Sequence, residues 1–479
     1  MATLDKAQPK IAVADIVRFG EKLVIPDGMA LDEAMALLKR RQEYDSQATT
    51  LVATFEAFPY DGAVMLDRVL NRRYGWSPQI GTPGFFRENP PTLVWVNTGH
   101  AQVQQVPWGR FKLPNVEGWI ETDVDRSAGR FRFRIISEVL RRDEPVVKAL
   151  LDELRQEIAT NSIYRGKAIR IQFLDNDGHE VGLPEPKFLD TDSVNPEMLI
   201  LSEHLHRAVQ TNLFTPITRS ADCMLNGIAI KRGVLLGGTF GTGKTMIAHV
   251  ASKLAVDAGI TFLYISKAAE LAHAIEFARQ YQSPACVIFC EDIDREVSGE
   301  RTEEMDDILN TIDGIDSKTS NIIVVLTTNA IHDIHPAMLR PGRLDAVLDI
   351  TPPDAKAIER LIRAYAADAL EDGIDLAPVS AVLAGNIPAV IAEVVKRAKL
   401  SQLSLQAPDT RVTKLGSDAL LDAALTIQAQ VKLLNPTAPE PSNRLHDVFV
   451  ETVRQAFNGN SELIASTARQ VERIVNKVT

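Results

Sequence analysis

The sequence predicts an α/β fold, with a parallel sheet covered by helices that is preceded by an α+β region and followed by a helical region. From about residue 194, short apolar runs alternate with helical patterns, as in residues 286–290 (CVIFC) and 322–326 (IIVVL). Continuous apolar runs are typical of parallel strands buried on both faces. The first 190 residues differ, because prolines and glycines cluster there between short strand-like pieces. We therefore expect several domains within the 479 residues.

Composition and charge disfavour several classes of protein. The chain is 45% hydrophobic and 24% charged, which is ordinary for a globular protein. Its formal charge of −11 disfavours binding to nucleic acid that is mainly electrostatic. Three cysteines without a C-x-x-C pair indicate a reducing compartment rather than a disulfide framework. The N-terminus lacks a signal-peptide pattern and no apolar run is long enough for a membrane span, so we predict a cytoplasmic protein without a membrane partner.

We divide the chain into four parts. Residues 1–190 are expected to form an α+β N-terminal domain that binds a substrate or partner, and residues 191–352 the large α/β subdomain. Residues 353–434 are expected to form a helical lid subdomain, and residues 435–479 a linker and a C-terminal helix. Periodicity predicts helices at residues 31–44, 144–158, 198–209, 245–256, 269–281, 355–371, 387–403 and 417–434. It predicts strands at residues 92–97, 118–122, 130–136, 167–173, 233–236, 261–265, 286–290, 322–326 and 346–350.

The most informative stretch is GTFGTGKT at residues 238–245, which matches the phosphate-binding pattern G-x-x-x-x-G-K-[ST]. Such a loop lets several backbone N–H groups point at one anion, and the following helix adds the positive end of its dipole. Lys244 is expected to reach the β- and γ-phosphates, and the Thr245 hydroxyl to ligate Mg²⁺. The predicted nucleotide-binding residues are Gly238, Thr239, Phe240, Gly241, Thr242, Gly243, Lys244, Thr245 and Met246.

Acidic residues follow the third strand of the α/β region, in the sequence CEDID. We expect this strand to lie beside the phosphate-loop strand, which would bring Glu291 and Asp292 to the place of Mg²⁺ and the attacking water. We predict that Glu291 holds the metal together with Thr245, and that Asp292 orients or deprotonates the water. Asn329 follows the next strand, where its side chain can touch the γ-phosphate or the same water.

Two arginines in LRPGRLD, Arg340 and Arg343, are also predicted to be catalytic. An arginine offered to the γ-phosphate of a neighbouring subunit would stabilise charge in the transition state. The alternative is a surface ion pair at a helix end.

A second group of arginines lies in the N-terminal region, where Arg130, Arg132 and Arg134 alternate with apolar residues in GRFRFRI. A strand would place the arginines on one face and the apolar side chains on the other. An ordinary half-buried strand is favoured over a docking face for an acidic partner or nucleic acid.

Together, GGTFGTGKT, CEDID, TTN and LRPGRLD, in this order and at these intervals, resemble the AAA family of ATPases within the AAA+ superfamily of P-loop NTPases. The resemblance covers residues 194–400, approximately. It implies that the glycine-rich loop is the Walker A loop, Glu291 and Asp292 the Walker B pair, Asn329 sensor 1, and Arg340 and Arg343 the arginine fingers. It also implies ATP and Mg²⁺ as cofactors and a homo-oligomeric ring, usually a hexamer, with ATP sites between subunits.

The sequence departs from the family pattern in two places. The Walker B pair reads Glu291-Asp292 where the family has Asp-Glu, so the reach of each carboxylate changes by about 1.5 Å, one C–C bond. We expect hydrolysis to persist, and to be slower where such a displacement is costly. The second departure is the absence of an aromatic–hydrophobic–glycine pore loop after residues 261–265, which argues against hand-over-hand threading of a polypeptide. H-E-x-x-H is also absent, so a fused metalloprotease of the membrane AAA type is not expected.

The favoured function is an ATP-hydrolysing, ring-forming remodeller of a protein or protein complex, with residues 1–190 selecting the target. One alternative is a DNA-transaction ATPase, such as a loader or motor, which would use the arginine face. The acidic charge makes nucleic acid the weaker choice of partner. Another alternative is an ATP-gated oligomeric scaffold with low turnover, which the reversed carboxylate pair favours.

Overall fold

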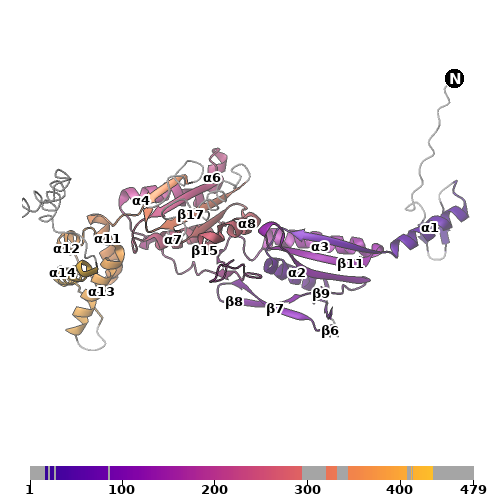
Figure 1. Ribbon diagram of the computed structural model, residues 1–479, viewed down its shortest axis with the longest axis horizontal. Coiled ribbons are helices and arrows are strands. Elements are labelled where there is room, and N and C mark those ends of the chain that lie inside the picture. The colour runs from indigo at the N-terminus through magenta and orange to yellow at the C-terminus, as the bar shows by residue number, and fades with distance from the viewer. Residues whose placement is uncertain are drawn as a thin grey trace, which may run out of the picture. The chain divides into compact units, whose positions relative to one another are not determined.

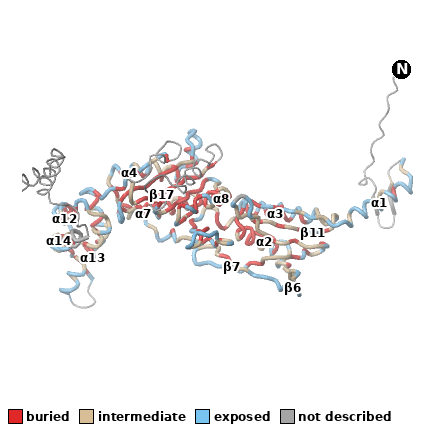
Figure 2. The backbone as a smooth tube through the Cα atoms, in the orientation of Figure 1, coloured by how far each residue is buried: buried red, intermediate tan, exposed pale blue. Residues whose placement is uncertain are grey.

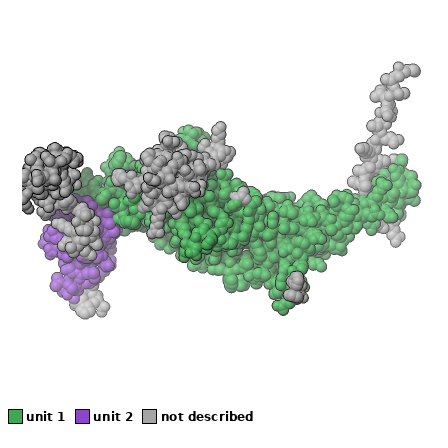
Figure 3. Space-filling model, in the orientation of Figure 1, with its two compact units in different colours: residues 1–357 green, residues 358–479 purple. Residues whose placement is uncertain are grey.

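The computed structural model describes residues 17–19, 22–25, 28–84, 87–293, 320–331, 344–406, 411–412 and 414–434. The chain divides into two compact units, residues 1–357 and 358–479, which Figure 3 draws in different colours. The expected linker and C-terminal helix at residues 435–479 lie outside the described residues.

The first region of unit 1 is built on a five-stranded antiparallel sheet in the order β3-β11-β10-β9-β4. Helices α2 (Pro59–Tyr74) and α3 (Glu144–Asn161) pack on each other and on this sheet (Figure 1). Helix α2 begins with a proline in its first turn and is capped by Gly75 in the left-handed conformation, both of which suit those positions. The strands are β3 (Ala48–Phe55), β4 (Gln79–Ile80), β9 (Arg110–Phe111), β10 (Gly118–Asp125) and β11 (Arg132–Leu140).

Smaller elements complete this region. The hairpin of β7 (Thr92–Gly99) and β8 (Gln102–Trp108) contacts α2 through β8. The other elements are β1 (Val17–Phe19), β2 (Lys22–Val24), α1 (Leu31–Asp45), β5 (Thr82–Pro83) and β6 (Glu88–Asn89). The predicted helices at residues 31–44 and 144–158 and the strands at residues 92–97, 118–122 and 130–136 are confirmed to within a few residues. Helix α2 and strand β3 were not predicted from the sequence.

The second region of unit 1 is a seven-stranded sheet in the order β13-β12-β15-β16-β17-β14-β18. Only the β12–β13 pair is antiparallel among the described pairs of this sheet. The predicted α/β fold with a parallel sheet is therefore confirmed. The strands are β12 (Ala168–Arg170), β13 (Lys187–Phe188), β14 (Arg232–Gly237), β15 (Thr261–Ile265), β16 (Cys286–Cys290), β17 (Ile322–Thr328) and β18 (Ala346–Asp349).

Two features of this sheet differ from what the sequence predicts. Strands β12 and β13 lie before residue 190, so the sheet includes chain that had been assigned to the N-terminal domain. The acidic strand β16 does not lie beside the phosphate-loop strand β14, because β17 pairs with both and separates them. Only tertiary pairing sets the order of parallel strands, and a one-strand displacement leaves each local pattern unchanged.

Helices cover both faces of the sheet. Neighbouring residues of a strand point to opposite faces, and accordingly Ile288 packs in a cluster with Ile275 of α8 while Phe289 packs in a cluster with Ile247 of α7. Every residue of β16 and β17 is buried, as the red tube at β17 in Figure 2 shows. The helices of this region are α4 (Glu203–Val209), α5 (Thr215–Thr218), α6 (Ser220–Leu225), α7 (Lys244–Asp257) and α8 (Leu271–Tyr281). A π-helical turn, Gln210–Phe214, joins α4 to α5.

The α8 side of the sheet shares its core with the first region. One continuous cluster contains Phe58 and Phe133 from the N-terminal sheet and its helices, and Phe277 and Tyr281 from α8. The rings of Phe58 and Phe277 lie with their centroids 5.3 Å apart. The N-terminal region and this face of the sheet therefore pack as one body.

Unit 2 is helical. Its elements are α11 (Ala355–Ala366), which starts at the end of unit 1, α12 (Ala377–Val382), α13 (Pro388–Ser404) and α14 (Ser417–Leu434). Helix α14 packs on α12 and α13. The interior is formed by side chains such as Leu383, Ile391, Val394 and Leu420. The predicted helices at residues 387–403 and 417–434 are confirmed, whereas the predicted helix at residues 355–371 ends as α11 at Ala366.

Candidate functional site

The glycine-rich loop connects β14 to α7, as its pattern predicts. Gly238, Gly241 and Gly243 have φ angles of +147°, +79° and +110°, a region that side chains with a Cβ rarely enter. A Cβ on Gly238 would lie 2.5 Å from the carbonyl oxygen of Ile350. The loop therefore depends on glycine for both its backbone conformation and its close approach to the end of the sheet.

The side chains of this loop separate into an exposed set and an inward set. Phe240 is 73% exposed, and Met246 faces solvent from the first turn of α7. Thr242 turns inward, and its hydroxyl donates a 2.9 Å hydrogen bond to the carbonyl oxygen of Thr239. This bond closes the loop on itself and leaves Phe240 at its tip.

Lys244 joins the loop to the next strand of the sheet. It is buried, and its Nζ donates hydrogen bonds to the carbonyl oxygens of Gly238 (2.6 Å) and Thr239 (3.1 Å) and to Oδ1 of Asn329 (2.8 Å). Asn329 directly follows β17, which pairs with the phosphate-loop strand. The predicted lysine and the predicted asparagine are thus in direct contact.

The two carboxylates of CEDID have different partners. The Thr245 hydroxyl donates a 3.0 Å hydrogen bond to Oε1 of Glu291, whereas Nδ2 of Asn329 donates a 2.8 Å hydrogen bond to Oδ1 of Asp292. The backbone N–H of Asp292 is held by Oγ1 of Thr327 at 2.9 Å, and its φ of +47° turns the chain sharply after β16. One carboxylate therefore faces the hydroxyl of α7 and the other faces the amide after β17.

Tyr264, which was not predicted from the sequence, completes this arrangement. The hydroxyl of Tyr264, in β15, donates a hydrogen bond to Oε2 of Glu291. Burial, and after it the bond to Glu291, raises the pKa of the Tyr264 hydroxyl, so it stays protonated and acts as a donor. The signal in the sequence was a tyrosine near the carboxyl end of the otherwise largely apolar strand TFLYI.

The donor set at this edge fits a divalent cation bound beside a phosphate. Thr245 offers a hydroxyl oxygen and Glu291 a carboxylate oxygen 3.0 Å away, and hard cations such as Mg²⁺ take oxygen ligands. Lys244 lies within the loop that would hold the phosphates. The predicted metal ligands are therefore together, and the predicted nucleotide-binding residues form one continuous turn around Lys244.

The remaining predicted catalytic residues, Arg340 and Arg343, lie outside the described residues. The three cysteines, Cys223, Cys286 and Cys290, are buried and free of disulfides. Within the described residues, no helix combines the length and the apolar character that crossing a bilayer requires.

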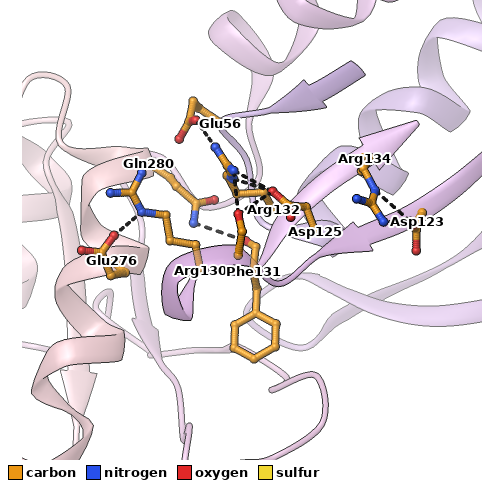
Figure 4. A network of polar contacts seen from close by, with 10 residues as sticks. Glu56, Asp123, Asp125, Arg130, Phe131, Arg132, Arg134, Glu276 and Gln280 are labelled. Atoms are coloured by element: carbon orange, nitrogen blue, oxygen red, sulfur yellow. Dashed lines mark hydrogen bonds and ion pairs between the residues drawn. The ribbon is translucent and has the colours of Figure 1, made fainter. Parts of the chain in front are cut away.

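The arginines of GRFRFRI are paired with acids (Figure 4). Arg132 contacts Asp125 at 2.6 Å and Glu56 at 3.0 Å, and Arg134 contacts Asp123. Arg130, which precedes β11, contacts Glu276 of α8. The alternation is confirmed, since Phe133 and Ile135 are buried between these residues. Because each arginine has an acidic neighbour, this face carries little net positive charge with which to attract nucleic acid.

Comparisons with known proteins agree with this geometry. Residues 234–352 match the model of the "ATPase family associated with various cellular activities (AAA)". An "ATP-dependent zinc metalloprotease FtsH 1" of Symbiobacterium thermophilum is 30% identical over 271 residues, which cover 52% of this chain and 42% of that protein. An "ATP-dependent zinc metalloprotease FtsH 2" of Sorangium cellulosum is 32% identical over 192 residues, or 36% of this chain and 32% of that protein.

A relative from another group is also similar. A "26S proteasome regulatory subunit 8 homolog" of Schizosaccharomyces pombe is 30% identical over 179 residues, which cover 33% of this chain and 44% of that protein. The similarity thus spans less than half of the length of each of these three relatives. The matched family segment contains the glycine-rich loop, both carboxylates and Asn329.

Proposed function

Residues 234–352 of this chain are an ATPase domain of the AAA family, and from that premise we propose that the chain binds and hydrolyses ATP with Mg²⁺ in order to remodel a protein or protein complex. The observation that carries the proposal is the meeting of three elements at one edge of the sheet. Lys244 contacts Asn329, Asn329 contacts Asp292, and Thr245 contacts Glu291. An anion-binding loop, a pair of oxygen ligands for a metal and a carboxylate that can orient water are the parts that ATP hydrolysis requires.

The phosphates are bound by the loop of residues 238–246. Its backbone N–H groups and Lys244 supply the positive field, and Gly238 allows the backbone to fold closely enough. Thr245 and Glu291 would hold Mg²⁺, whose charge neutralises the phosphate oxygens when it is bound. Binding requires Lys244 to exchange its contacts with the carbonyl oxygens of Gly238 and Thr239 for contacts with phosphate oxygens.

Asp292 is proposed to orient and deprotonate the attacking water. Its Oδ1 accepts a hydrogen bond from Asn329, and that contact holds the carboxylate toward Lys244. Arg340 and Arg343 are proposed to act on the phosphates of a neighbouring subunit, an assignment that rests on their motif alone. On this proposal the protein works as a homo-oligomeric ring, usually a hexamer in this family.

The N-terminal region is proposed to select a protein target rather than to feed a central pore. The connection from β15 to α8, where threading relatives carry an aromatic loop, is short: β15 ends at Ile265 and a 3₁₀ turn starts at Ala268. The chain between β12 and β13 packs on this connection, since the backbone N–H groups of Phe173 and Leu174 donate hydrogen bonds to Glu270. These contacts support remodelling without hand-over-hand threading.

We also propose a cytoplasmic location, which the three buried free cysteines support. A second candidate function is an ATP-gated scaffold with low turnover, because the longer of the two carboxylates stands on the metal side. A DNA-transaction role loses its main support, since the arginines on which it depended are paired with acids.

The test compares Lys244→Ala with Lys253→Ala, a change on the same helix at an exposed ion pair with Asp257. Calorimetry with ATP and release of phosphate are measured for both variants and for the unmodified protein. We expect Lys244→Ala to lose binding and turnover and Lys253→Ala to keep both. Unchanged ATP affinity in Lys244→Ala would rule out the phosphate-loop assignment, and stable ATP binding with only one turnover in the unmodified protein would favour the scaffold.

A further inference from the structure

We propose that Tyr264 is a positioning residue that fixes the metal-side carboxylate of Glu291, and that Arg170 holds the Tyr264 ring in place. The proposal rests on the proposed function, because it concerns how the same site holds its metal. It explains how a glutamate can stand where the family has an aspartate.

The carboxylate of Glu291 is held at both of its oxygen atoms. Thr245 donates to Oε1 from helix α7, and Tyr264 donates to Oε2 from strand β15. Two donors on different elements fix both the position and the rotation of the carboxylate plane. A single donor would fix only one oxygen and leave the other free to turn.

Glutamate needs this second contact more than aspartate does. Its side chain has one additional rotatable bond, and each bond that must be fixed costs conformational entropy. Glu291 also borders a cavity of about 350 Å³, lined by Thr245, His249, Tyr264 and Arg170 among others. Without the Tyr264 hydroxyl, the longer side chain has room to turn into this cavity and away from Thr245.

The sheet sets the position of the Tyr264 hydroxyl. Tyr264 pairs with Phe289 of β16 on one side and with Arg170 of β12 on the other. Its ring stacks on Phe289 with centroids 5.8 Å apart, and the Arg170 guanidinium lies 5.1 Å from the ring centroid. A ring held on both sides has little freedom, so its hydroxyl remains directed at Glu291.

The experiment measures how much Mg²⁺ the ATP-bound protein needs. Binding of a fluorescent ATP analogue is followed in EDTA and then during titration with Mg²⁺, and Mn²⁺ binding is followed by electron paramagnetic resonance. We expect Tyr264→Phe to keep the metal-free nucleotide affinity and to raise the half-saturating Mg²⁺ concentration by about tenfold, as partners of metal ligands typically do. Tyr164→Phe is the matched control, because its buried hydroxyl has no hydrogen-bond partner among the described residues.

A second background separates positioning from a merely structural role. In Glu291→Asp the shorter carboxylate no longer reaches Tyr264, so adding Tyr264→Phe is expected to change the Mg²⁺ requirement by less than about twofold. An unchanged Mg²⁺ requirement in Tyr264→Phe, or an equal effect in both backgrounds, would overturn the proposal. Failure of the unmodified protein to bind ATP would instead contradict the proposed function.

Discussion

The hydroxyl of Tyr281 donates a hydrogen bond to the carboxylate of Asp61 over 3.0 Å, which joins two residues that lie 220 positions apart. Asp61 is buried in the first turn of α2 and Tyr281 ends α8. Asp61 also accepts hydrogen bonds from the Ser162 hydroxyl (2.6 Å) and the Ile163 N–H (2.9 Å), and Tyr281 accepts one from the Phe58 N–H. A polar network within an aromatic cluster therefore links the N-terminal region to the seven-stranded sheet.

This network predicts a pH-dependent stability. Burial raises the pKa of Asp61 above its ordinary value of 3.8, against the lowering effect of its hydrogen bonds. Protonated Asp61 contributes its full stabilisation below pH 3.8, the pKa of the unfolded state. That stabilisation is lost as the pH rises through the raised pKa of the folded state. Asp61→Asn removes this loss, so the variant should gain stability relative to the unmodified protein as pH rises, by at most about 1.4 kcal/mol per pH unit.

The measurement is denaturation at several pH values, followed by tryptophan fluorescence. All four tryptophans lie between residues 76 and 119, so the signal reports the N-terminal region. Asp152→Asn, on the exposed face of α3, serves as the control. A stability difference that stays constant with pH would contradict the role given to burial of Asp61.

A second prediction concerns Gly238. In Gly238→Ala the new methyl group would meet the Ile350 carbonyl oxygen at 2.5 Å, at a φ of +147°. We expect ATP affinity to fall by more than about tenfold, or 1.4 kcal/mol. Gly178→Ala is the matched control: its φ of +85° is also positive, but nothing lies within 4 Å of the added atom. Calorimetry with ATP on both variants checks the expectation. Equal losses of ATP affinity in the two variants would mean that the close contact at Gly238 is not the cause.

The two carboxylates should respond differently to amide substitution. Asp292→Asn should retain ATP and lose turnover by about 10²-fold or more, because the proposed base is removed while Thr245 and Glu291 remain. Glu291→Gln should chiefly raise the Mg²⁺ requirement. Asp257→Asn, at the exposed end of α7, is the control. If Glu291→Gln traps ATP and Asp292→Asn does not, the two roles are exchanged.

The proposed ring predicts complementation between inactive subunits. Arg343→Ala should spare ATP binding and reduce turnover by about 10³-fold, if the arginine acts in trans. Mixing it with Asp292→Asn subunits should restore part of the activity, since an intact Asp292 site can then meet an intact Arg343. Phosphate release of each variant alone and of the mixture provides the comparison. Turnover of Arg343→Ala within a few-fold of the unmodified protein would remove the role.

Local sequence was sufficient for the phosphate-binding part of the site. A strand, a glycine-rich turn and a helix in direct succession determine where Gly238 and Lys244 lie, and the structure places both accordingly. The polar ends of β16 and β17 were also predictable, because parallel strands bring their carboxyl ends to one edge. Asp292 and Asn329 are therefore neighbours although the strand order was misjudged.

Contacts between distant segments were not predictable in the same way. Arg170 and Tyr264 come together only because β12 adds to the sheet beside β15, a pairing that no local pattern records. The charge of Arg130 could be read from the sequence, but its partner Glu276 is 146 positions away. The pairing of such residues depends on the tertiary fold, so a pattern that resembled a basic face proved to be an ion-paired one.

The shared core on the α8 side has a practical consequence for dissecting this protein. The chain after residue 190 is not a self-contained domain that can be produced by truncation at that point. Such a cut would discard β12 and β13 and strip Phe58 and Tyr164 from the aromatic rings of α8. A fragment that starts at residue 191 would expose this apolar surface to water. Aggregation of such a fragment should not be mistaken for ring assembly.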